Sequence, residues 1–154
     1  MYLLLLSLVF STTYASVEVS MPLDAYIKML PYYMQCIAES AIDPSILTIL
    51  SQTTHVPVTE PFKKYVGCLL RVSGYGDENG KFIVSKILTL FPENVRSEEL
   101  KKALEECNNK SNGSNTGETS FEVYQCYIDT SPARITIPGS SLISSMSSLP
   151  LSLL

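Results

Sequence analysis

The side chains best suited to chemistry in this sequence are its cysteines and its single histidine: Cys36, Cys68, Cys107, Cys126 and His55. No two cysteines have the close C-x₂₋₄-C spacing of a zinc site, and a lone histidine cannot supply a site with several histidine ligands. In an oxidising compartment an even number of cysteines instead indicates disulfides, here two. Four cysteines allow three pairings, and their spacing leaves the choice open.

Catalytic motifs are absent from the sequence. His55 lies among Thr, Pro and Val residues, and the chain has no G-x-S-x-G elbow, P-loop or G-x-G-x-x-G segment. The turn 77–80 fails as a calcium loop, because the sixth position of that pattern needs Gly and here is Phe82. We therefore expect no enzyme, no metal and no cofactor. We interpret His55 as an exposed loop residue, with a pH sensor as the alternative.

The composition is that of one globular domain. Of 154 residues, 45% are hydrophobic and 17% are charged, and the formal net charge is -4. No run of basic residues is longer than two, whereas nucleic acids and anionic membranes attract concentrated basic faces. We expect neither of them as a partner.

Residues 1–15 have the features of a secretory signal peptide. The run 3–10 is apolar apart from Ser7, which is too short for a membrane span of about 20 residues. Thr13 and Ala15 then offer small residues for cleavage. A buried N-terminal helix is the alternative. We expect a secreted, extracellular chain without membrane insertion, in which all the cysteines lie in an oxidising compartment.

Apolar residues recur at three- and four-residue steps along the rest of the domain 16–136, which predicts an all-α fold. Pro31 should kink or split the first helix, and Asp43 with Pro44 can start the second. The run 81–91 is apolar nearly all round, which favours a central helix over a buried strand. The six short helices predicted are 23–41, 44–50, 60–73, 81–91, 97–107 and 119–131.

Further local signals concern the second half of the chain. Ser97 can cap the fifth helix, and Thr119-x-x-Glu122 is a capping-box pattern for the sixth. The loop between these helices carries two glycosylation sequons, at Asn109 and Asn112. The Ser/Leu-rich segment 137–154 forms a tail, either a flexible extension or a lid over a cleft.

The cysteine framework within six helices resembles the insect odorant-binding protein family. The segment FKKYVGCLLRVSGYGDENGKF at 62–82 carries most of the resemblance, with a cysteine helix, an acidic glycine-ended turn and an apolar run. The sequences around Cys36, Cys107 and Cys126 are also similar. The family usually has six cysteines. At the two missing positions this chain has Lys64 and Gly117, as expected for a four-cysteine ("minus-C") branch.

The resemblance implies the pairing Cys36–Cys68 and Cys107–Cys126 and a central apolar cavity. The family's usual cavity positions, mapped by their distance from each cysteine and extended to the central helix, give ten candidate ligand-binding residues. Two of them, Tyr33 and Tyr127, could donate hydrogen bonds to a ligand oxygen. The candidates are Met29, Tyr33, Val66, Leu70, Leu88, Phe91, Leu104, Val123, Tyr127 and Ile135.

The function that the resemblance implies is that of a secreted carrier of odorants, pheromones or similar apolar molecules, acting in olfaction or transport. Its partner would be a small apolar ligand, a membrane receptor is left open, and we expect a monomer or weak homodimer. The alternative is a secreted helical protein, such as a salivary or venom component, that acts through protein–protein contacts. That alternative predicts a filled core and an exposed apolar patch.

Overall fold

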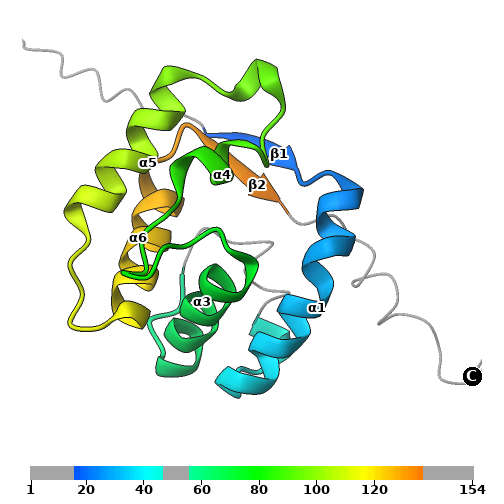
Figure 1. The fold of residues 1–154 in the computed structure, drawn as a ribbon, viewed down its shortest axis with the longest axis vertical. Coiled ribbons are helices and arrows are strands. Elements are labelled where there is room, and N and C mark those ends of the chain that lie inside the picture. Colours follow the sequence, from blue (N-terminus) through cyan, green and yellow to red (C-terminus); the bar gives the residue numbers. More distant parts are fainter. Residues whose placement is uncertain (1–15, 47–55, 137–154) are drawn as a thin grey trace, which may run out of the picture.

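Helices form the body of the protein, and two short strands lie side by side in the upper part of the view in Figure 1. The computed structural model describes residues 16–46 and 56–136, so the predicted signal peptide 1–15, His55 and the tail 137–154 lie outside the described residues. The residues 44–46 are helical where the second helix is predicted.

The all-α prediction is confirmed. In chain order the elements are β1 (Val17–Ser20), α1 (Leu23–Ser40), α3 (Glu60–Ser73), α4 (Val84–Leu88), the 3₁₀ helix η1 (Glu93–Val95), α5 (Glu98–Lys110), α6 (Thr116–Thr130) and β2 (Ala133–Thr136).

Local caps set the starts of α3 and α5. The Thr59 side chain accepts a hydrogen bond from the Phe62 amide at the start of α3. Gly74, with a φ of 71°, ends this helix in the left-handed conformation that glycine adopts without strain. Ser97 accepts a hydrogen bond from the Leu100 amide at 3.1 Å and opens α5. Both helices therefore begin where their sequence signals predict.

Two other helices differ from the sequence-based expectation. Helix α1 runs through Pro31 without interruption, so the chain is not split there. Helix α6 begins at Thr116 and not at the predicted Thr119. The reason is that the Asn115 side chain accepts a hydrogen bond from the Glu118 amide at 3.0 Å, and asparagine is at least as good a cap as threonine.

The predicted helix 81–91 is confirmed only over Val84–Leu88, and its predicted bounds are wrong. Tertiary hydrogen bonds fix the preceding residues in an extended form. The Asn108 side chain on α5 accepts from the Phe82 amide and donates to the Phe82 carbonyl, both at 2.9 Å. Phe82 also forms an antiparallel bridge with Gly76. The helix can therefore start only after Phe82, which these hydrogen bonds hold in an extended form.

The strands β1 and β2 pair in parallel, with Val17 opposite Ala133 and Ser20 opposite Thr136. One more backbone bond extends the pairing, from the Met21 amide to the Thr136 carbonyl at 2.9 Å. The sequence analysis missed both strands. Each has only four residues, and its partner lies at the other end of the domain, so no local signal marks it.

Buried apolar side chains form two clusters. One lies between α1, α3 and α6, and the other lies between α4, α5 and α6 and reaches both strands. Five side chains are only partly buried and yet pack against both clusters, and we call them the junction residues: Leu70, Tyr75, Tyr124, Ile128 and Ile135.

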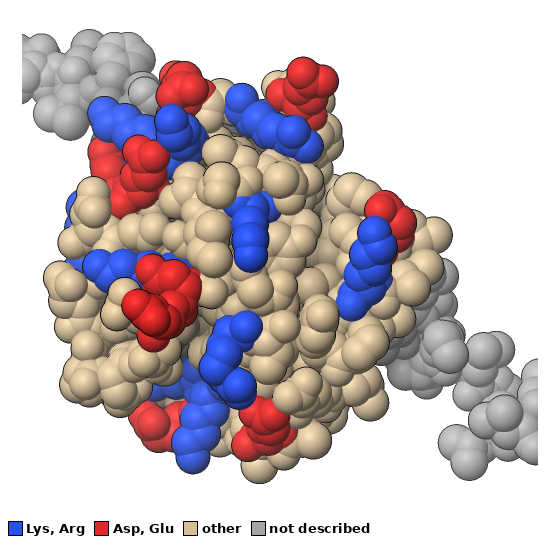
Figure 2. Space-filling model, in the orientation of Figure 1, with Lys and Arg blue, Asp and Glu red and all other residues tan. Residues whose placement is uncertain are grey.

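The charged side chains are dispersed over the face shown in Figure 2. Acidic and basic residues alternate there, and neither sign forms a continuous patch. Within residues 16–46 and 56–136, no helix is both long enough and apolar enough to cross a lipid bilayer.

Candidate ligand-binding site

Two disulfides tie the four long helices together in pairs. Cys36–Cys68 joins α1 to α3, and Cys107–Cys126 joins α5 to α6, with Cα atoms 5.6 and 5.5 Å apart. This is the pairing that the resemblance implies. Since α3 also packs against α6, the helices are held around the junction residues.

The ten candidate residues lie in and between the two clusters. Three belong to the cluster of α1, α3 and α6: Met29, Tyr33 and Val66. Five belong to the cluster of α4, α5 and α6 or pack against it: Leu88, Phe91, Leu104, Val123 and Tyr127. Leu70 and Ile135 pack against both clusters. Leu104 and Val123 are at most 1% exposed, whereas Leu70 and Ile135 are only partly buried.

Tyrosines from several elements gather at the first cluster and the junction, and the sequence analysis singled out only Tyr33 and Tyr127 among them. The rings of Tyr26 and Tyr33 on α1 are 6.1 Å apart, and those of Tyr124 and Tyr127 on α6 are 6.5 Å apart. Tyr65 on α3 is buried in the same cluster as Tyr33. The helical spacing of Tyr26, Tyr65 and Tyr124 was visible in the sequence. Mapping the family's cavity positions by distance from each cysteine did not select these three tyrosines.

Burial changes the acid–base behaviour of these phenols. It raises the pKa of Tyr33 to about 12. The nearby Tyr26, Tyr124 and Tyr75 raise the pKa of Tyr33 further. Burial also raises the pKa of Tyr124 to about 12 and the pKa of Tyr65 well above its usual value. The phenols therefore stay neutral at physiological pH and keep their protons for donation.

Tyr127 connects α6 to β2. Its hydroxyl oxygen accepts a hydrogen bond from the Ile135 amide at 2.9 Å. A phenol that accepts one bond still has a proton to donate, so Tyr127 can both anchor the strand and offer a donor to a ligand.

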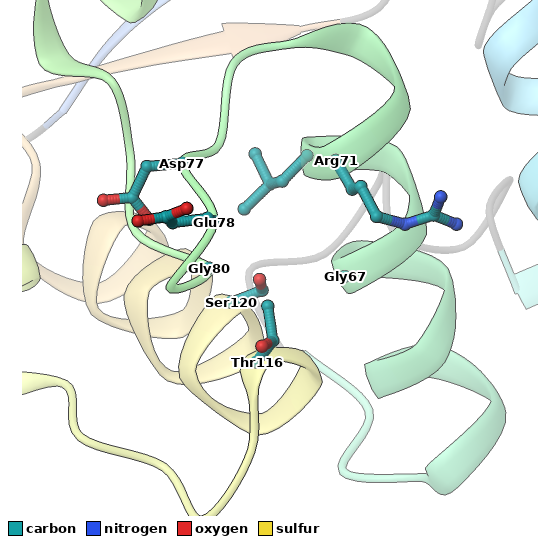
Figure 3. A pocket seen from close by; sticks show the side chains of 8 residues that line it. Gly67, Arg71, Asp77, Glu78, Gly80, Thr116 and Ser120 are labelled. Atoms are coloured by element: carbon teal, nitrogen blue, oxygen red, sulfur yellow. The ribbon is translucent and has the colours of Figure 1, made fainter.

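A small hollow opens between α3, the turn after it and the first turns of α6 (Figure 3). Its volume is about 50 Å³. A cavity needs about 10–15 Å³ of such volume to hold one water, and small-molecule sites have about 300–1,000 Å³, so the hollow has room for water and not for an apolar ligand. The hydroxyl of Ser120, which is 1% exposed, lines the hollow and has no hydrogen-bond partner within residues 16–46 and 56–136. A bound water would satisfy it.

A wider groove of about 470 Å³ adjoins this hollow and is open to solvent. Lys64 on α3 and Gly117 on α6 both line it, and these are the positions that the resemblance assigns to the missing cysteine pair. The two helices approach closely here, because a Cβ on Gly67 would lie 3.1 Å from the Cα of Gly117. Glu39, Arg71 and other polar groups also line the groove, so it does not suit an apolar ligand.

The two sequons differ in their surroundings. Asn109 is exposed in the last turn of α5, but the Ser111 hydroxyl of its sequon is buried and donates to the Cys107 carbonyl at 2.8 Å. Asn112 is exposed after the helix, and the Ser114 hydroxyl of its sequon is exposed and donates to Glu118. Separately, no cluster of three or more His, Cys, Asp or Glu residues suited to a metal ion occurs within the described ranges.

The sequence matches a known protein family, and the fold is similar to that of solved structures. The model of the PBP/GOBP family matches residues 24–130. No curated protein matches the sequence. The fold is similar to that of odorant-binding protein 7 from Anopheles gambiae, solved in complex with an azo compound, at 22% identity and a TM-score of 0.53. That match covers 70% of this chain and 86% of the mosquito chain.

Two further solved structures have a similar fold. Odorant-binding protein 1 from Locusta migratoria matches at 17% identity and a TM-score of 0.58, over 72% of this chain and 84% of the locust chain. The fatty acid binding protein OBP56a from the oral disk of the blowfly Phormia regina matches at 17% identity and a TM-score of 0.58. It covers 72% of this chain and 95% of the blowfly chain.

Proposed function

Because the chain belongs to the PBP/GOBP family, in which insect odorant-binding proteins are grouped, we propose that it is a secreted carrier of small apolar molecules. Proteins of this family bind small molecules and are not enzymes. The carrier role of this chain, its secretion and its part in olfaction or transport are our proposal. A membrane receptor as the recipient of the ligand, and a monomer or weak homodimer as the working form, belong to the same proposal.

The junction residues carry this proposal. They contact both clusters, so they lie centrally, and yet they keep part of their surface accessible. The accessible part of these central side chains is where we propose that an apolar ligand makes contact. The residues concerned supply an apolar lining, through Leu70 and Ile128, and a polar one, through the hydroxyls of Tyr75 and Tyr124, which is the usual make-up of a small-molecule site.

Burial of apolar surface would provide most of the binding energy. A ligand that buries about 300 Å² of apolar surface gains about 7.5 kcal/mol at 25 cal/mol per Å². A gain of this size corresponds to a dissociation constant of about 3 μM, and ordering of the ligand and of side chains offsets part of it, so we expect affinities of tens of micromolar or weaker for a ligand of this size. With few polar groups in the lining, selectivity among apolar ligands of similar size should be broad.

The solved structures of similar fold support a ligand of this kind. The mosquito protein was solved with an azo compound, and the blowfly protein is described as a fatty acid binding protein. At these identities the two structures show only that this chain shares their fold, so the ligand of this chain has to be identified by experiment.

The decisive experiment is displacement of an apolar fluorescent probe. The full sequence is expressed in insect cells, and the protein is purified with both disulfides intact. Saturable probe uptake, with selective displacement by volatile alcohols, esters and aromatic compounds, would establish the carrier. A folded protein that takes up no probe would refute the proposal. N-terminal sequencing of the purified protein tests the predicted cleavage of residues 1–15 in the same preparation.

A second candidate function is favoured by the exposed face of α1. Leu23, Ile27 and Met34 are 65%, 55% and 67% exposed, and Leu30 between them is 39% exposed. They recur at four- and three-residue steps and form an apolar stripe on the helix surface. Such a stripe is typical of a surface that meets another protein, so contact with a protein partner is the alternative if the probe is not taken up.

A further inference from the structure

An apolar stripe on the surface of α1 stays exposed within the described part of the chain. Leu23, Ile27, Leu30 and Met34 recur at steps of four, three and four residues, so they lie on one face of the helix. Three of these side chains are at least 55% exposed. The buried residues of α1 belong to a different face, which packs against the core. We call the four exposed residues the α1 stripe.

The α1 stripe is small for a contact between separate proteins. A stable interface of that kind buries about 800 Å² on each partner and involves about 20–30 residues a side. Separate partners also lose translational and rotational freedom when they associate, whereas a segment of the same chain is tethered and loses less of it. A stripe of this size therefore suits an occupant from the same chain.

The segment 137–154 leaves the fold close to the start of α1. Ser20 stands opposite Thr136 in the register of the two strands, and the Met21 amide donates to the Thr136 carbonyl at 2.9 Å. Thr136 is the last residue of β2, and α1 begins at Leu23. The residue that precedes the segment is therefore hydrogen-bonded to the chain just before the first residue of the α1 stripe.

The composition of the segment 137–154 also fits this surface. The segment contains eight large apolar residues, seven serines and no charged residue. Leu142, Met146 and Leu149 recur at the same four- and three-residue steps as the α1 stripe. Apolar side chains gain free energy when they leave water, and an uncharged segment offers no ion pair that would hold it elsewhere.

The length of the segment is sufficient for this contact. The α1 stripe from Leu23 to Met34 is about 16 Å long at a rise of 1.5 Å per residue. The residues 137–141 can bridge up to about 20 Å as a linker, and 142–149 span about 10 Å if helical or about 25 Å if extended. A tether this short keeps the local concentration of the segment in the millimolar range.

We propose that the segment 137–154 packs its apolar side chains against the α1 stripe, on the outer surface of the helix. The contact covers apolar surface that would otherwise be available for self-association. The segment then acts as part of the outer wall and not as a lid, since no residue of the α1 stripe lines the hollow or the groove between α3 and α6. The inference is independent of the proposed carrier function.

Tryptophan fluorescence tests this contact, because the chain has no tryptophan of its own. Met146→Trp in the full chain, secreted from insect cells, places one reporter in the segment. We expect this reporter to emit at shorter wavelength than in the urea-unfolded protein and to be protected from acrylamide quenching, to the same extent at every protein concentration. Adding Ile27→Gln and Met34→Gln should shift the emission to longer wavelength and remove the protection.

The matched control adds Val17→Gln and Val58→Gln to the reporter variant. These residues are 56% and 65% exposed, close to the 55% and 67% of Ile27 and Met34, but they lie outside α1. The reporter should stay protected in this control. Circular dichroism shows whether each variant is folded, and Met34→Gln alone replaces the double substitution if that variant is not.

Three outcomes would overturn the inference. A reporter that is accessible to acrylamide in the folded protein would leave the α1 stripe to a separate protein partner. Protection that survives Ile27→Gln and Met34→Gln would mean that the segment lies elsewhere on the protein. Protection that disappears on dilution would assign the α1 stripe to a second copy of the chain.

Discussion

The hydroxyl oxygen of Tyr127 lies 2.9 Å from the amide nitrogen of Ile135 and accepts its hydrogen bond. The bond crosses from α6 to β2 and holds the last strand against the helix that carries Cys126. Ile135 is one of the junction residues, so one side chain couples the position of the sheet to the proposed binding site.

Loss of this bond should destabilise the protein. Tyr127→Phe removes the acceptor and leaves the Ile135 amide without a partner, which we expect to lower the free energy of unfolding by about 1–3 kcal/mol. Urea unfolding measures the change. Tyr32→Phe is the control, because Tyr32 is 36% exposed, and this variant should match the unaltered protein within about 0.5 kcal/mol. Equal stability of the two variants would show that the bond contributes nothing.

Tryptophan substitutions should distinguish the junction from the packed core. Leu70 is partly buried and borders both clusters, so Leu70→Trp should fill accessible space and weaken probe binding about tenfold with little change in melting temperature. Leu104 is 1% exposed, and Leu104→Trp should instead lower stability by about 1–3 kcal/mol, because the site has no room for the larger ring. Probe titration and thermal melting on both variants measure these effects. Unchanged probe affinity in Leu70→Trp would remove this residue from the ligand site.

A third disulfide should form across the groove between α3 and α6. Lys64 and Gly117 line the same groove, so the double variant Lys64→Cys, Gly117→Cys should lose both new thiols on oxidation. The bond would close a loop of about 50 residues and stabilise the protein by up to about 4 kcal/mol. Thiol titration and melting temperature report the two effects. The pair Lys102→Cys, Gly117→Cys, which has its first cysteine on the exposed face of α5, should keep its thiols, and thiols that persist in both pairs would contradict the prediction.

Stability should fall at high pH because of the buried phenols. Burial raises the pKa of Tyr33 and of Tyr124 to about 12, whereas tyrosine in an unfolded chain titrates near 10. The unfolded state therefore releases its protons first. The stabilising effect is complete below about pH 10 and is lost as the pH rises toward 12. Urea unfolding at pH 8, 10 and 11 should show a constant and then a falling free energy, and Tyr33→Phe should make the fall shallower. A slope as steep as that of the unaltered protein would assign the effect to other groups.

The sequence could predict those parts of the fold that short-range chemistry determines. Ser97 and Gly74 act within one turn of their own helices, so the start of α5 and the end of α3 were predictable. The region 81–91 was not, because the Asn108 side chain on a different helix holds Phe82 in an extended form. The strands were missed for the same reason, since β1 acquires its structure only from β2.

The candidate site was predictable to a similar extent. Counting from the cysteines selected Leu70, which packs against both clusters, because it lies two residues from Cys68 on the same helix. It did not select Tyr124, which also packs against both clusters, because in the sequence this tyrosine has the features of an ordinary core residue. Its position between the two clusters depends on how α6 packs against α3 and α5, which only the fold shows.

The parallel pairing of β1 with β2 gives the chain a built-in order of maturation. If the chain is secreted while it is being synthesised, Val17–Ser20 enters the lumen before the described helices, and its partner Ala133–Thr136 enters after them. The loop that must close is nearly the whole domain, and closure of a long loop is slow and entropically unfavourable. Cys126 emerges before β2, so both covalent links can be made while the two strands are still apart. The sheet is then the last element to form, and a chain truncated before residue 133 would be cross-linked and helical while its N-terminal strand still presented an unpaired edge to other chains.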